Sequence, residues 1–343
     1  MKFDFVIGNP PYQDNTIGDN STYAPPVYHL FMEAAYSVSD KVELIHPARF
    51  LFNAGSTPKA WNQKMLNDNH FKVLYYEQDS SKVFANTDIK GGVVVSYYNR
   101  HEDYSAIETF TPFAELNSIL NKVVHTDSFE TIMPIIFIQN RFVLDELYKM
   151  YPETRAVIGS DGKDKRFEKN IFTKVSSAFT EDKLNDDDIH VLGIVNNKRN
   201  WRYIRKRFVD MEHENINKYK VLLPTSNGSG AIGEVLSTPL VGTPLVGYTR
   251  SFIGIGAFDT ESEVNACFKY IKSKFARTML GILKITQDNN RDTWKYVPLQ
   301  DFTPNSDIDW SVSVKEIDKQ LYKKYGLSEE EITFIETHVK EME

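Results

Sequence analysis

The chain has 343 residues, of which 41% are apolar and 25% are charged, and its net charge is −7. This length and apolar content are sufficient for two folded cores. The negative net charge excludes a protein that coats nucleic acid through its overall charge, so any contact with DNA needs a local basic surface. A single cysteine excludes an internal disulfide and a cysteine-based metal cluster. The chain lacks both a signal-peptide pattern and an apolar run of about 18 residues. These two features predict a cytoplasmic protein without a membrane partner.

The first twelve residues predict a strand that runs into a rigid corner. The apolar residues of 3–7 indicate a short buried strand, and Gly8 frees the backbone at its end. The next four residues, called the Asn9–Tyr12 loop below, are Asn9, Pro10, Pro11 and Tyr12. Two prolines fix the backbone and remove two N–H donors, so the loop should be rigid and exposed at the carboxyl end of a strand, where open α/β sheets bind ligands. Its amide, carbonyls and aromatic ring suit a planar ligand with an exocyclic amine.

Helices and strands alternate over the next ninety residues. The spacing of apolar residues predicts a helix over 23–38, a strand over 41–52 that ends near Pro47, a helix over 58–67, and strands over 71–76 and 93–98. This order indicates an α/β sheet with two final strands that pair in antiparallel fashion.

The pattern changes after residue 111. A helix is predicted over 112–124, then a mixed region to about residue 260, a strand over 251–258, a long helix over 264–283 with a capping box at Thr260 and Glu263, a helix over 317–325 and a last helix over 328–339. The pentapeptide Thr-Pro-Leu-Val-Gly occurs twice in succession over 238–247, which suggests a loop or strand extension. The Gly-rich stretch 227–233 is expected to form a loop, because no hydrophobic strand of the right kind precedes it.

Three stretches resemble one enzyme family. The Asn9–Tyr12 loop after a hydrophobic strand resembles the catalytic motif of amino-methyltransferases that depend on S-adenosylmethionine. Residues 71–100 are similar to the region after that motif in the gamma class of N6-adenine DNA methyltransferases, and 88–93 (Asp-Ile-Lys-Gly-Gly-Val) resembles a segment of bifunctional, type IIG-like restriction–modification enzymes of type II. Residues 316–336 resemble the end of those enzymes, whereas 151–196 match least.

The resemblance implies an α/β fold: the second half of a Rossmann-like methyltransferase sheet, followed by an α+β target-recognition domain. The expected domains are a catalytic half over 1–125, the recognition domain over 126–310 and a C-terminal helical segment over 311–343. The family's Gly-rich cofactor turn should precede the catalytic loop. We therefore expect a C-terminal half whose cofactor, S-adenosylmethionine, is held with an upstream methyltransferase or nuclease segment, or through self-association at an exposed edge strand.

The same resemblance implies a mechanism for the loop. The Asn9 side-chain oxygen and the Pro10 carbonyl would accept the two N6 hydrogens of adenine and leave the lone pair free for the methyl group, which is catalysis by positioning. The adenine must leave the duplex to reach the loop. Tyr12, and Phe84 where the family places an aromatic residue, would stack on the extruded base.

A basic cluster lies in the expected recognition domain. Six cations and two aromatic residues fall within 198–207, a pattern that can neutralise phosphates and stack or wedge. The alternative is a solvated strand face with two core aromatic residues, but we expect contact with double-stranded DNA. The predicted contact residues are Lys198, Arg199, Trp201, Arg202, Arg205, Lys206 and Arg207.

Other readings of the chain stay open. The same loop serves protein-glutamine and RNA methyltransferases, although the long region after it argues against a protein substrate. A DNA-recognition fragment without catalytic activity is the alternative from another class. Residues 181–183 (Glu-Asp-Lys), with Asp161 and Asp164 upstream, match the sequence motif of metal-dependent nucleases. Their polar surroundings favour a loop instead, and no metal site is expected.

Overall fold

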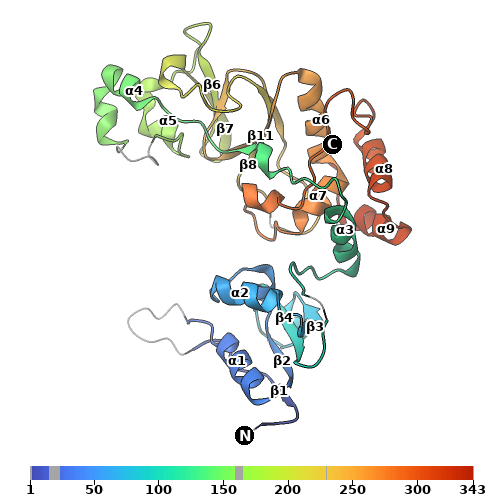
Figure 1. Ribbon diagram of the computed structural model, residues 1–343. Coiled ribbons are helices and arrows are strands. Elements are labelled where there is room, and N and C mark those ends of the chain that lie inside the picture. The colour runs from blue at the N-terminus through green and yellow to red at the C-terminus, as the bar shows by residue number, and fades with distance from the viewer. Residues whose placement is uncertain (1, 15–23, 105, 159–164, 229, 343) are drawn as a thin grey trace. The chain divides into compact units, whose positions relative to one another are not determined.

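The computed structural model describes residues 2–14, 24–104, 106–158, 165–228 and 230–342. The chain divides into two compact units, residues 1–117 and 118–343, and each is described by itself (Figure 1). Among the described residues, no helix combines the length and the apolar character needed to cross a membrane.

The first unit is built on a mixed four-stranded sheet. Its strands are β1 (Val6–Gly8), β2 (Lys41–Pro47), β3 (Phe71–Glu77) and β4 (Val93–Asn99), in the order β1-β2-β4-β3. β1 and β2 are parallel, and β4 is antiparallel to both β2 and β3. Consequently β1, β2 and β3 point the same way, and the segments that follow them all leave at one edge of the sheet. The predicted strands and the antiparallel pairing of the last two are confirmed.

Two helices cover one face of this sheet. Both α1 (Tyr28–Val38) and α2 (Lys59–Leu66) contribute to a core with Val42 and Leu44 of β2 and Val94 of β4. α1 begins at Tyr28, after two prolines at 25 and 26, and its expected start at residue 23 lies outside the described residues. α2 begins directly after Pro58, close to the predicted position.

The expectation of a buried first strand is wrong. β1 is an edge strand; Ile7 within it is 74% exposed, and Phe5, just before it, is 44% exposed. They point to the face opposite α1 and α2, because Val6 pairs with the core residue Val42 and side chains alternate along a strand. The same face carries Tyr97, whose ring stacks on Phe5 at 6.2 Å, and Tyr75, which is 49% exposed. Apolar side chains therefore line an open face next to an edge strand.

The second unit begins within α3 (Ala114–Val124), which confirms the helix predicted there. It holds two sheets. The three-stranded sheet has the order β10-β6-β7, with β6 (Ile189–Val195), β7 (Lys198–Ile204) and β10 (Val246–Tyr248). The four-stranded sheet has the order β5-β11-β8-β9, with β5 (Ile136–Phe137), β8 (Tyr219–Pro224), β9 (Leu240–Gly242) and β11 (Phe252–Phe258).

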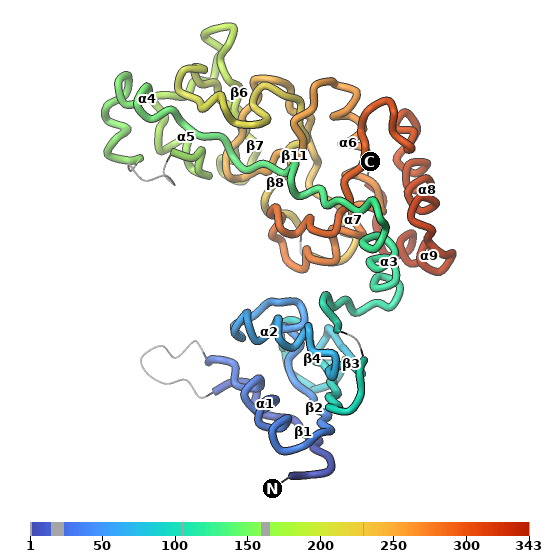
Figure 2. Tube along the Cα trace, viewed as in Figure 1, coloured from blue at the N-terminus to red at the C-terminus, as the bar shows by residue number. Residues whose placement is uncertain are grey.

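Helices lie at both ends of this unit. Figure 2 shows the segment after α3 running past β11 to α4 (Leu144–Met150) and α5 (Ile171–Lys174), away from the later helices. The two sheets share a small core of Leu192, Leu222, Val246, Tyr248 and Phe252. A second core joins the outer side of β6 and β7 to α4 and α5.

The repeated pentapeptide connects the two sheets. Its first copy forms β9, at the edge of the four-stranded sheet, and its second copy begins β10 in the three-stranded sheet. Leu245 takes a left-handed conformation with φ 64°, so that the second copy starts its strand only at Val246. Identical residues thus form strands in different sheets because their neighbours differ.

The long helix predicted over 264–283 is wrong in one respect. It is two helices, α6 (Glu261–Lys272) and α7 (Lys274–Gly281), although the capping box at Thr260 and Glu263 is confirmed. Ser273 separates the helices and caps α7. Asp318, on α8 (Val314–Lys324), accepts hydrogen bonds from the backbone N–H groups of Lys274 and Phe275 at 3.1 and 2.9 Å. The carboxylate satisfies donors that a new helix start leaves unpaired, so the break is stable.

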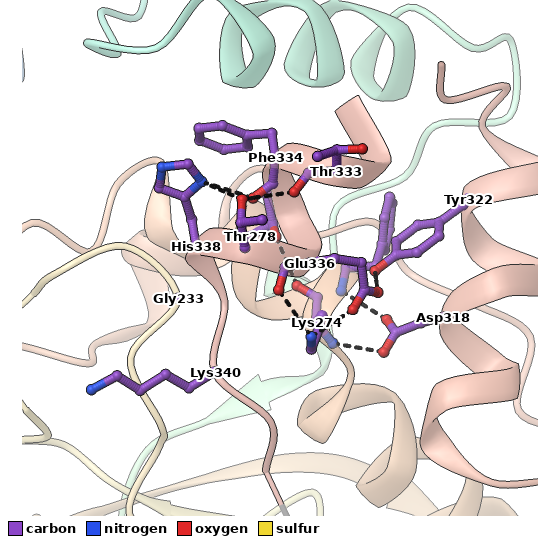
Figure 3. Close-up of polar contacts among 12 residues, drawn as sticks. Gly233, Lys274, Thr278, Asp318, Tyr322, Thr333, Phe334, Glu336, His338 and Lys340 are labelled. Carbon is purple, nitrogen blue, oxygen red and sulfur yellow. Dashed lines mark hydrogen bonds and ion pairs between the residues drawn. The ribbon is translucent and has the colours of Figure 1, made fainter. Parts of the chain in front are cut away.

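The last helix closes this end of the unit. α9 (Glu329–His338) starts close to the predicted position, and Ser328 and Glu331 form a capping box there. Lys274 pairs with Glu336 at 2.6 Å, and the Tyr322 hydroxyl donates to the same carboxylate at 2.9 Å (Figure 3). α7, α8 and α9 are therefore joined by one polar network, in which burial raises the pKa of Asp318 to about 6.

Candidate functional site

The Asn9–Tyr12 loop leaves β1 at the edge where β2 and β3 also end. Two backbone contacts fix its far end: the Tyr12 carbonyl accepts from Val27 N–H at 3.1 Å, and Asp14 N–H donates to the Pro25 carbonyl at 2.9 Å. Asn9 is exposed and Tyr12 is half-buried. The loop is thus a tethered corner that presents an amide side chain to solvent.

The Tyr12 side chain offers its ring rather than its hydroxyl. Burial raises the pKa of the Tyr12 phenol, and the nearby Asn9 side chain acts in the opposite direction. The hydroxyl oxygen is buried and has no hydrogen-bond partner of normal geometry within the described part of the chain. A buried hydroxyl without a partner adds no stability, so we expect the aromatic surface to be the useful part of this residue.

Phe84 lies in the loop between β3 and β4, which begins at the same edge. Ser80 organises this loop, because its buried hydroxyl accepts from Ile89 N–H at 2.8 Å and its carbonyl accepts from Phe84 N–H at 2.8 Å. Phe84 is half-buried. β1 and β3 are the two outer strands, three strand spacings or about 14 Å apart, so the loops must lean toward each other for Phe84 and Tyr12 to meet one base.

Arg49 packs against Gly91, in the loop between β3 and β4, and was not predicted from the sequence. It follows β2 directly, and Ala48 N–H donates to the Gly92 carbonyl at 3.0 Å, which joins the end of β2 to the start of β4. A Cβ atom at Gly91 would lie 2.4 Å from Arg49 Cγ, so Gly91 makes room for this side chain. In the sequence, Arg49 is marked only by its position two residues after Pro47, which ends β2.

The described residues do not provide a cofactor turn of the Rossmann kind. As expected, the described residues of the Gly-rich stretch 227–233 form a loop. It follows β8, which pairs in antiparallel fashion with β9 and β11, and the next regular element is β9 and not a helix. A Cβ atom at Gly230 would strike the backbone of Thr286 at 2.2 Å, and one at Gly233 the backbone of Val339 at 2.5 Å. These glycines serve close packing, and the stretch lacks the strand–turn–helix geometry that binds a nucleotide.

The basic cluster does not form one surface. Side chains of β7 alternate, so Lys198 and Arg202 lie on one face and Arg199, Trp201 and Tyr203 on the other. Both aromatic rings are half-buried and lie 4.3 Å from the ring of His190 on β6. The rings therefore already have partners within the chain.

Several cations of the cluster also have partners. Arg202 forms an ion pair with Glu181 at 2.9 Å. Glu181 is the first residue of the Glu-Asp-Lys stretch over 181–183 that was considered as a nuclease motif. The Arg199 guanidinium donates to the Thr238 carbonyl. Lys198, Arg205 and Arg207 are exposed. Asp161 and Asp164 lie outside the described residues.

The chain is similar in part to known proteins. Residues 1–84 match the family model described as Eco57I restriction-modification methylase. A protein of Mycoplasma pneumoniae (strain ATCC 29342 / M129 / Subtype 1), named an uncharacterized adenine-specific methylase, is 30% identical over 112 residues, which are 32% of this chain and 26% of that protein. The expected resemblance to adenine methyltransferases of restriction–modification systems is confirmed.

A solved structure also resembles the chain, at low similarity. The type IIL restriction-modification enzyme MmeI, determined in complex with DNA, aligns with a TM-score of 0.42 and 10% identity over 98% of this chain and 56% of that one. This chain therefore spans about a quarter of the length of the curated relative and little more than half of the solved enzyme.

Proposed function

We propose that the chain takes part in site-specific methylation of adenine N6 in DNA within a restriction–modification system, with S-adenosylmethionine as the methyl donor. The observation that carries the proposal is the Asn9–Tyr12 loop, which leaves a parallel strand at the carboxyl edge of the sheet, within the residues that match the methylase family. Ligands of open α/β sheets bind at this edge.

In the proposed mechanism, the chain positions the base and its amine. The Asn9 side-chain oxygen and the Pro10 carbonyl accept the two N6 hydrogens, which localises the lone pair on nitrogen and makes it a nucleophile. Tyr12 stacks on the extruded adenine, and Phe84 approaches it from the neighbouring loop. The exposure of the Asn9 amide supports this arrangement, because the amide is accessible to a base that enters the site.

We further propose that the cofactor-binding half comes from outside these 343 residues, either from another segment or from a partner chain. β1 is an edge strand, and the face beside it exposes Phe5 and Ile7. An unpaired edge with apolar neighbours is suited to further strand pairing. In the order β1-β2-β4-β3, the strand β4 runs antiparallel to both of its neighbours. This arrangement supports the proposal that the first unit is the second half of a doubly wound sheet.

The second unit is the proposed target-recognition domain, so that double-stranded DNA is the proposed partner. Its exposed cations Lys198, Arg205 and Arg207 support this role. Arg199, Arg202 and Lys206 are half-buried and would contribute less to contacts with phosphates.

The test is transfer of a labelled methyl group from S-adenosylmethionine by the protein purified from its host, together with any partners that it retains. The products from duplex DNA, RNA and protein are separated and identified by mass spectrometry. We expect N6-methyladenine in DNA. Methylated glutamine or RNA would favour the other enzymes that use this loop, and DNA binding without any transfer would favour an inactive recognition fragment.

A further inference from the structure

A groove in the second unit lies apart from the basic cluster of β7. It has a volume of about 490 Å³. Segments far apart in the sequence form its walls, namely residues 138–139, 166–169, 225–226, 250–253 and 287–291. The groove is not apparent in the sequence, because its charged residues are scattered over 126 positions.

Among the described residues, four cations line the groove, together with one carboxylate, that of Asp288. The cations are Arg166, Lys169, Arg250 and Arg291. Of these, Arg250 pairs with Glu168 at 3.2 Å. The remaining surplus of positive charge is unusual for a chain whose net charge is −7, and a concave surface concentrates such a field.

The groove has two exposed cations and one buried donor without a partner among the described residues. The Arg166 Nε atom is buried and has no hydrogen-bond partner among the described residues, which is costly for a donor unless something else satisfies it. Lys169 and Arg291 are exposed, and neither forms an ion pair within the described part of the chain. Ser226 and Asn290 add uncharged polar groups beside them.

The walls of the groove are held in place by buried hydrogen bonds. Asn289, which precedes Asn290 and Arg291, is buried; its side chain donates to the Pro224 carbonyl at 3.0 Å and accepts from Trp294 Nε1 at 2.9 Å. On the opposite wall, Arg250 N–H donates to the Phe167 carbonyl at 2.7 Å. The cations therefore project from fixed backbone, which reduces the entropy lost when a ligand binds.

The groove is near the exposed start of β7. Arg250 comes two residues after the end of β10, which runs parallel to β6, and β7 starts beside the end of β6. Tyr248, at the end of β10, is level with Leu192 and Trp201, so Lys198 lies two strands across and three residues farther along the sheet, or about 14 Å away. One polyanion can contact both places.

We propose that this groove binds the phosphodiester backbone of duplex DNA. The groove supplies fixed guanidinium and ammonium groups, which bind phosphates and release counterions, while bases are read elsewhere. The choice of DNA as the polyanion rests on the proposed function. The test needs neither cofactor nor methyl transfer, so its result can be read even if the proposed activity fails.

The experiment measures binding of the full chain to a labelled 30-base-pair duplex of random sequence over a series of salt concentrations. The double variant Lys169→Gln/Arg291→Gln is expected to bind at least about ten-fold more weakly, and its plot of log affinity against log salt should be shallower by about 1.8, since each phosphate contact contributes about 0.9. The variant Lys169→Arg/Arg291→Lys keeps both charges and should retain binding.

The matched control is Lys295→Gln/Lys323→Gln, which removes two exposed cations of the same unit outside the groove. It should bind within about two-fold of the unmodified chain, with the same salt slope. The proposal is overturned if both Gln double variants bind alike, if the unmodified chain binds no DNA, or if duplex RNA competes as strongly as duplex DNA.

Discussion

Gly8 of β1 pairs with Leu44 of β2 in parallel register, so Asn9 leaves the sheet three residues before β2 ends and on the same side. This single pairing brings the Asn9–Tyr12 loop to the same edge as Arg49 and the loop of Phe84. The proposed methylation site depends on this edge, and the following predictions test its parts.

Tyr12 should act through its ring. Because the hydroxyl is buried without a partner in the described chain, Tyr12→Phe should retain nearly full activity. Tyr12→Ala removes the stacking surface and should lower kcat/KM for DNA by about 5- to 150-fold, which corresponds to about 1–3 kcal/mol of stacking. Methyl transfer by both variants, together with the fluorescence of 2-aminopurine at the target position, checks this. Equal activity of the two variants would contradict a stacking role.

Gly92 should be required for the shape of the loop that carries Phe84. Its φ is +78°, and a Cβ atom would lie 2.3 Å from the Glu77 carbonyl oxygen, which is backbone and cannot easily move. We expect Gly92→Ala to lower methyl transfer at least about ten-fold, and to lower stability by about 1–3 kcal/mol. Gly326→Ala is the control, since it has φ +58° with nothing within 4 Å. Full activity of Gly92→Ala would show that the loop's shape is unimportant.

His46 should make the first unit sensitive to acid. The side chain is fully buried, its Nε2 atom lies 2.7 Å from Ser96 Oγ, and burial lowers the pKa of His46 from 6.5 to about 4. The folded state therefore binds this proton less readily than the unfolded state, so stability is present above pH 6.5 and is lost as the pH falls toward 4. The loss should approach about 3 kcal/mol.

Hydrogen exchange of peptides covering β2 and β4, followed from pH 7 to pH 4, measures this effect. His46→Gln should remove most of the pH dependence, whereas the control His101→Gln, at an exposed position, should leave it unchanged. An unaltered pH dependence in His46→Gln would show that other groups cause the loss.

Ile7 should serve an interface rather than the fold of this unit. The side chain is 74% exposed on the open face beside the edge strand. Ile7→Asp should change the stability of the isolated chain by less than about 0.5 kcal/mol, as expected for a surface position, but abolish methyl transfer in the host. Leu184→Asp, at another exposed apolar position, is the control. Strong destabilisation of the isolated chain by Ile7→Asp would mean that β1 is needed for its own unit.

The sequence was sufficient where the structure follows local rules. The ends of β2 and β4 and the caps at Thr260 and Ser328 follow from apolar spacing and side-chain chemistry within a few residues. The apolar residues before Asn9 indicated a strand but not that it lies exposed at the edge of the sheet. The break at Ser273 could not be predicted in the same way. It depends on Asp318, which lies 45 positions away and satisfies the new helix start.

The charged surfaces show the same limit. The run of cations at 198–207 is conspicuous in the sequence, yet strand alternation divides it between two faces and Glu181 pairs with Arg202. In contrast, Arg166 and Arg291 meet at one groove only because the second unit folds its distant segments together. Sequence proximity therefore overestimates one basic surface and misses the other.

The central claim is that Asn9 holds the amine of the target adenine. The most direct measurement replaces Asn9 by Ala in the chromosomal gene of the host and maps N6-methyladenine across its genome, with Gln13→Ala as the control. We predict that methylation disappears at one sequence motif in Asn9→Ala and persists in the control. Methylation of every motif at unchanged levels in Asn9→Ala would contradict the account.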